Sequence, residues 1–71
     1  MCRSIKRLRE GTQVGSDDDV RAASRQFVRK VTGFQHPSAK HQDAFERAID
    51  EISHTVEHLL ADVVAKLPAA S

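Results

Sequence analysis

Apolar residues recur at intervals of three and four in the first half of the chain, which is the spacing of one face of an α-helix. Between residues 17 and 32 they are Val20, Ala23, Phe27, Val28 and Val31. Ser16 stands where an N-cap is needed, and the three aspartates that follow it would complement the helix dipole. Gly33 can adopt the left-handed conformation that ends a helix. We therefore predict a helix over about 17–32.

A second and longer stretch has the same periodicity. Its apolar positions are Phe45, Ile49, Ile52, Val56, Leu59 and Val63, widened by Ala48, Leu60 and Val64. Pro37 and Ser38 are suited to begin a helix here, with Ser38 as the N-cap, and Pro68 prevents it from continuing. We predict this helix over about 39–66. Because the connection between the helices is short, they are expected to form an antiparallel hairpin.

The two predicted helices differ in length, at roughly 24 Å and roughly 42 Å. The end of the longer helix would therefore lack a partner within the hairpin, at Val56, Leu59, Leu60, Val63 and Val64. Ile5 and Leu8, near the N-terminus, could fold back over only part of this stripe. A second copy of the chain could cover the rest, so we predict an all-α fold that dimerises into a four-helix bundle.

A chain of 71 residues allows a single domain, and one of marginal stability without help. We divide it into a basic arm (1–10), a linker (11–16), the helical hairpin (17–66) and a frayed tail (67–71). No apolar stretch has the length of a membrane span, and the single cysteine cannot form an intrachain disulfide. We therefore expect a soluble cytoplasmic protein that makes no contact with membranes and needs no cofactor.

Cys2 is the first residue that could carry chemistry. If Met1 is removed, Cys2 presents a free α-amine beside its thiol, and this pair can act as a nucleophile or chelate a soft metal. Arg3 and Lys6 nearby would favour the thiolate. Nothing else in the chain completes a catalytic set, so the sequence does not indicate a dedicated enzyme. The alternative is an ordinary N-terminal cysteine in a reducing compartment.

The segment from His54 to His58 matches the H-x-x-E-H pattern of inverted zinc peptidases and places two imidazoles one helical turn apart. The apolar stripe of the second helix turns both histidines outward, however. A peptidase site would also need a third ligand and a cleft that excludes water. His54 and His58 are therefore a weak candidate metal site, and the alternative is an exposed helical face that binds Zn²⁺ or Ni²⁺ adventitiously.

Positive charge is the third candidate feature, because it could contact the phosphates of a nucleic acid. The candidate residues are Arg7, Arg9, Arg21, Arg25, Arg29 and Lys30, together with Arg3 and Lys6 of the arm. In the alternative interpretation, the arginines pair with carboxylates of the second helix, namely Asp43, Glu46, Asp50 and Glu51. The order of elements also resembles the ribbon-helix-helix repressors, but Ile5 and Leu8 are spaced for a helical turn rather than a strand.

Several segments resemble a family of small bacterial and fungal proteins known only as a domain of unknown function. They are the opening Met1-Cys2-Arg3-Ser4-Ile5-Lys6, then Ala22-Ala23, residues 26–34, Pro37-Ser38 and residues 44–48. The resemblance covers residues 1 to about 67, and it implies no activity. The residues that fall on the family pattern are Cys2, Arg3, Lys6, Arg29, Lys30, Gly33, Pro37 and Ser38. The linker from Gly11 to Gly15 and His41 depart from that pattern.

Gly33, Pro37 and Ser38 already have structural roles, whereas Cys2 and Arg3 have none. We therefore interpret the chain as an uncharacterised homodimeric interaction or regulatory module, with Cys2, Arg3 and Lys6 as its candidate functional arm and with a further protein as a possible partner. Two alternatives stay open: a nucleic-acid-binding protein that uses the arm and the arginines of the first helix, and a metal- or thiol-dependent activity at Cys2.

Overall fold

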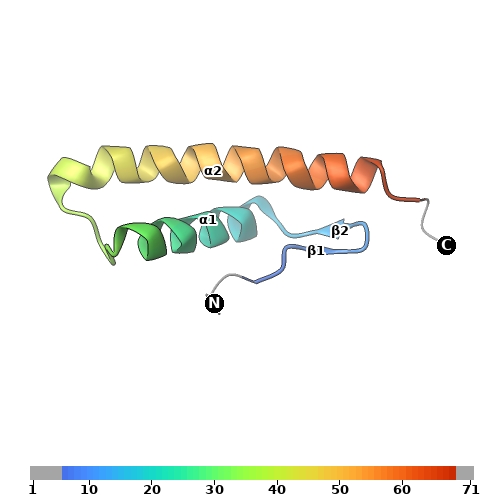
Figure 1. Ribbon diagram of the computed structural model, residues 1–71, viewed down its shortest axis with the longest axis horizontal. Coiled ribbons are helices and arrows are strands. Elements are labelled where there is room, and N and C mark those ends of the chain that lie inside the picture. Colours follow the sequence, from blue (N-terminus) through green and yellow to red (C-terminus); the bar gives the residue numbers. More distant parts are fainter. Residues whose placement is uncertain (1–5, 69–71) are drawn as a thin grey trace.

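Two helices of unequal length lie side by side and antiparallel, and a short β-hairpin precedes the first of them (Figure 1). The computed structural model describes residues 6–68. Its elements are β1 (Arg9–Glu10), β2 (Gln13–Val14), α1 (Asp17–Thr32) and α2 (Ala39–Ala65). The β-hairpin lies beside the half of α2 that extends past the start of α1 (Figure 1). The predicted helical hairpin is confirmed, and both helices have the expected bounds to within one residue.

Local chemistry explains where α1 begins and ends. The Ser16 side chain accepts a hydrogen bond from the backbone N–H of Asp19 at 3.1 Å, and the Asp19 carboxylate accepts one from the N–H of Ser16 at 3.3 Å. These two bonds form a reciprocal capping box. At the other end Gly33 has φ of 77°, and its N–H donates to the carbonyl of Arg29 at 2.9 Å. The capping roles predicted for Ser16 and Gly33 are confirmed.

The two N-cap serines allow a matched test of this cap. Ser16→Ala should lower the free energy of unfolding by about 1 kcal/mol, because the N–H of Asp19 loses its acceptor. Ser38, at the start of α2, makes no side-chain capping bond, so Ser38→Ala should have a clearly smaller effect. Urea unfolding followed by circular dichroism measures both. Equal losses in the two variants would contradict this account of the cap.

The segment between the arm and α1 corrects the all-α prediction and the interpretation of residues 11–16 as an irregular linker. Arg9 pairs with Val14 and Glu10 with Gln13, which leaves a two-residue loop at Gly11 and Thr12. Gly11 has φ of 59°, as expected for the first loop position of a type II′ hairpin. The N–H of Gly15 donates to the carbonyl of Leu8 at 2.8 Å, which extends the pairing.

The core lies along one line of contact between α1 and α2. Its fully buried apolar residues, among those described, are Val20, Val28, Phe45 and Ile49. Two serines complete the line: Ser24 lies between the valines, and Ser53 follows Ile49 by one turn. The Ser24 hydroxyl donates to the carbonyl of Val20 at 2.9 Å, which satisfies it within its own helix. Each helix therefore buries a row of residues spaced by four.

This packing corrects the predicted apolar stripes, which were too wide to be buried by one partner helix. Phe27 is 47% exposed, Val31 64% and Leu59 57%. The row of Val20, Ser24 and Val28 turns toward α2, so the neighbouring apolar positions are left at its edge. Leu8 is half-buried and lies over the middle of the hairpin rather than over the end of α2, while Ile5 lies outside the described residues.

Candidate interaction surface

One face of the two-helix layer is apolar. We define the apolar face as Ala23, Phe27 and Val31 of α1 with Ile52, Val56 and Leu59 of α2. A groove of about 380 Å³ between the helices occupies part of this face. Leu8, Phe27 and Val56 are among the residues that line it. A two-helix layer with such a face normally buries it against another layer of secondary structure.

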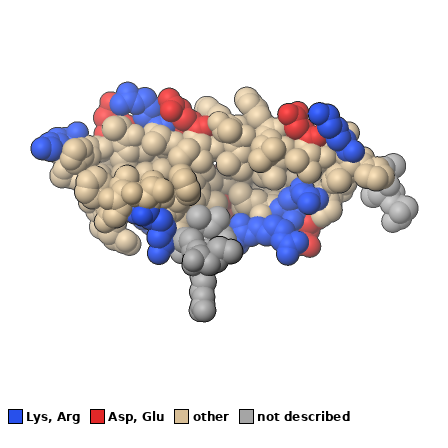
Figure 2. Space-filling view, viewed as in Figure 1, with Lys and Arg blue, Asp and Glu red and all other residues tan. Residues whose placement is uncertain are grey.

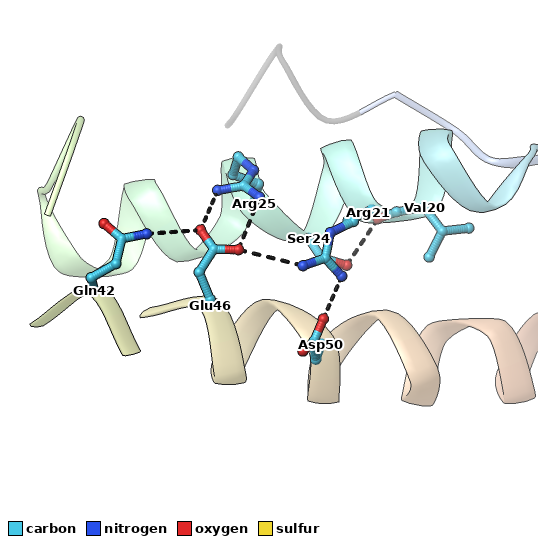
Figure 3. A network of polar contacts seen from close by, with 7 residues as sticks. All are labelled: Val20, Arg21, Ser24, Arg25, Gln42, Glu46 and Asp50. Carbon is cyan, nitrogen blue, oxygen red and sulfur yellow. Dashed lines mark hydrogen bonds and ion pairs between the residues drawn. The ribbon is translucent and has the colours of Figure 1, made fainter. Parts of the chain in front are cut away.

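The other edge of the layer is held by ion pairs that cross from α1 to α2 (Figure 3). Arg25 binds Glu46 in a bidentate manner, with N···O distances of 2.8 Å and 3.1 Å. Arg21 donates to Asp50 and lies 3.4 Å from Glu46. The Gln42 amide donates to Glu46 at 3.4 Å, so Glu46 accepts bonds from three side chains. The alternative interpretation, in which the helix-one arginines pair with α2 carboxylates, therefore holds for Arg21 and Arg25.

These contacts alter the titration of the groups involved. The hydrogen bond from Arg25 is the main reason that the pKa of Glu46 is lowered, and burial opposes it in part. The hydrogen bond to Asp50 is the main reason that the pKa of Arg21 is raised above its ordinary value. Any phosphate contact by Arg21 or Arg25 would have to compete with these carboxylates.

The remaining cations proposed for phosphate contact are mostly engaged by near neighbours. Lys6 lies 3.4 Å from Asp19, and Arg7 lies 3.5 Å from Glu10. Arg9 donates to the carbonyl of Gly11 at 2.7 Å. In Figure 2 the Lys and Arg side chains form several separate groups rather than one continuous stripe. Arg29 and Lys30, at the end of α1, have no ion-pair partner among residues 6–68.

The two other candidate sites are the histidine pair of α2 and the N-terminal cysteine. His54 and His58 are exposed and one turn apart on α2, as predicted, but residues 6–68 contain no group of three or more His, Cys, Asp or Glu that could hold a metal ion. Cys2 and Arg3 lie outside the described residues.

Of the acids expected to pair with arginine, Asp43 instead lies 3.9 Å from Arg47 of its own helix. Within the described chain, neither helix is both long and apolar enough to cross a lipid bilayer.

A family model described as an uncharacterised conserved protein, DUF2277, matches residues 1–71. The chain belongs to this family. The match agrees with the resemblance found in the sequence, and it brings no activity to the chain. No curated protein and no solved structure matches the chain. What this DUF2277 member does must therefore be inferred from its own geometry.

The sequence predicted that Leu8 could fold back over the apolar stripe but not which residues of α1 it would meet, and it gave no signal for Gln42. Leu8 of the DUF2277 chain lines the apolar groove because the β-hairpin turns the arm back along α1. Gln42 joins the ion-pair network although it carries no charge. The Gly11-Thr12 loop was the available signal for Leu8, since glycine at the first position of a two-residue loop favours a hairpin. Nothing in the spacing alone singled out Gln42.

The ion-pair network predicts a dependence of stability on pH. Because folding lowers the pKa of Glu46 below its ordinary value of 4.5, the pairs stabilise the fold above that pH and lose their effect as the pH falls through the lowered pKa. Glu46→Gln should lower the free energy of unfolding near pH 7. It should also make that free energy fall less steeply as the pH drops below about 5, and urea unfolding measures both effects. Glu51→Gln makes the same charge change at an exposed site and should retain the wild-type profile. A wild-type acid profile in Glu46→Gln would contradict this role.

Proposed function

We propose that this protein is a homodimeric, cytoplasmic interaction module in which the apolar faces of two copies pack together as a four-helix bundle. The observation that carries the proposal is the exposure of large apolar side chains on one face of the hairpin. Phe27 and Leu59 come from different helices, and each is about half exposed in the single chain. Exposed apolar residues gathered on one face are typical of a protein interaction site.

The small core supports the need for a partner. Only four apolar side chains are fully buried among the described residues. So small a core buries little apolar surface to offset the conformational entropy of ordering the chain. A domain of this size commonly gains its remaining stability from association. Burying the apolar face would enlarge the core without adding a residue to the chain.

A second copy fits this face better than an unrelated surface. Lys30 follows Phe27 by three residues, and Asp62 follows Leu59 by three, so each borders the apolar face on its own helix. Both charged residues are exposed. A two-fold axis that sets α1 of one copy against α2 of the other would bring charges of opposite sign together at both edges.

Sedimentation velocity of the untagged protein over a range of concentrations tests the proposal. We expect a species of twice the chain mass that dissociates only on dilution. A monomer at every concentration would contradict the homodimer and would direct attention to a different protein as the occupant of the apolar face. A larger assembly would contradict a closed two-fold interface.

A further inference from the structure

The cross-helix ion pairs repeat once per helical turn, and the series ends at Arg25. Arg21 pairs with Asp50, and one turn further along α1 Arg25 pairs with Glu46, one turn back along α2 (Figure 3). Continuing by one turn in each helix places Arg29 opposite Gln42. Gln42 is neutral, and its amide donates to Glu46 instead. Arg29 is thus the one member of the arginine series on α1 for which the register supplies no carboxylate.

The consequence is visible at the guanidinium of Arg29. Its Nε atom is shielded from solvent and has no hydrogen-bond partner among the described residues. A shielded donor of a charged group without an acceptor is costly, because the group has given up water without a replacement. The Nε–H of Arg29 is therefore a donor that an oxygen of a bound ligand could satisfy. Arg21 and Arg25, by contrast, both have carboxylate partners.

A hollow of about 350 Å³ adjoins this guanidinium. Arg29, Arg25 and Lys6 bring positive charge to its lining, and Gln26 adds an amide. The one acidic residue of the lining is Asp19, whose carboxylate is already engaged by Lys6 at 3.4 Å and by the N–H of Ser16. The volume lies at the lower end of the range for small-molecule sites and exceeds what one inorganic anion needs.

We propose that this hollow binds the oxyanion group of a small molecule, either a phosphate ester or a carboxylate, with Arg29 as the principal ligand. The planar guanidinium can hold two oxygens of such a group at once, as Arg25 does with Glu46. Lys6 adds a second charge and Gln26 a neutral donor. Only Ala23 belongs both to the lining of this hollow and to the apolar face, and the charged and amide ligands come from a single chain, so the site does not require a second copy.

Amide and guanidinium NMR spectra of the full chain test this site by titration. The probes are inorganic phosphate, O-phosphoserine and acetate, each compared with sodium chloride at the same ionic strength. We expect saturable shifts at Gln26 and at the Arg29 side chain with at least one oxyanion, and the comparison of phosphoserine with acetate identifies the preferred group. Shifts of the same size with chloride would mean an adventitious ion only and would overturn the proposal.

Three variants locate the binding. Arg29→Gln should weaken it at least about tenfold, whereas Lys40→Gln, which removes the same charge from an exposed position at the start of α2, should stay within about twofold of wild type. Gln42→Glu supplies the missing carboxylate of the register and should compete with the ligand, again weakening binding about tenfold. If Arg29→Gln does not fold, Gln42→Glu still decides the matter. Unchanged binding in Gln42→Glu or in a folded Arg29→Gln would overturn the proposal.

Discussion

Phe27→Asp is expected to convert the proposed dimer into a folded monomer. In the proposed bundle this ring lies at the centre of the interface, so the variant loses a large apolar contact and buries a carboxylate without a partner. We expect the dissociation constant of the dimer to rise by at least about 100-fold. Because the ring is 47% exposed in the single chain, the fold of each hairpin should survive. Sedimentation velocity measures the first effect and circular dichroism the second.

Ala22→Asp is the matched control for this experiment. It also replaces an apolar residue of α1 by aspartate, but Ala22 is exposed and lies on the side of α1 away from Phe27. It should dimerise like the wild type. Dissociation of both variants to the same degree would show that added negative charge, rather than the loss of the Phe27 contact, weakens association. A Phe27→Asp protein that remains dimeric would remove Phe27 from the interface.

Ile49→Ala is expected to give the largest loss of stability of any single substitution in the hairpin. The Ile49 side chain has no exposed surface and packs between Val28 and Phe45 in the core. Truncation leaves a cavity and should cost about 2–5 kcal/mol, which is a large share of the stability of a domain of this size. Urea unfolding should show this loss at every protein concentration.

Leu59→Ala serves as the comparison, because it shortens another apolar side chain of α2. Leu59 is 57% exposed in the single chain, so the loss should appear only at concentrations at which the protein is dimeric. A concentration-independent loss for Leu59→Ala would mean that this residue packs within its own chain. A loss well under about 1 kcal/mol for Ile49→Ala would contradict the position assigned to the core.

Local signals in the sequence were sufficient to predict the helices. Ser16 and Gly33 act on backbone groups within one turn of themselves, so their effect can be predicted without the rest of the fold. The β-hairpin was missed because β1 and β2 have two residues each, too few for an alternating pattern. Only the turn chemistry of Gly11 indicated it.

The position of the core was less predictable, for a different physical reason. Hydrophobicity assigned Phe27 and Leu59 to the buried side, yet the single hairpin buries Ser24 and Ser53 instead. Which residues face the partner helix depends on how α1 and α2 rotate against each other, and periodicity alone does not fix that rotation. The same register determines that Arg25 binds Glu46 and that Arg29 lies opposite Gln42.

In the proposed dimer a second copy of this chain covers the apolar face. Isotope-filtered NOE spectra of a mixture of labelled and unlabelled protein test this arrangement, because they record only contacts between copies. We predict intermolecular contacts from the Phe27 ring to methyl groups of α2, among them those of Val56 and Leu59. A spectrum that shows no intermolecular contact at Phe27, or contacts only at the ion-paired edge, would contradict the claim.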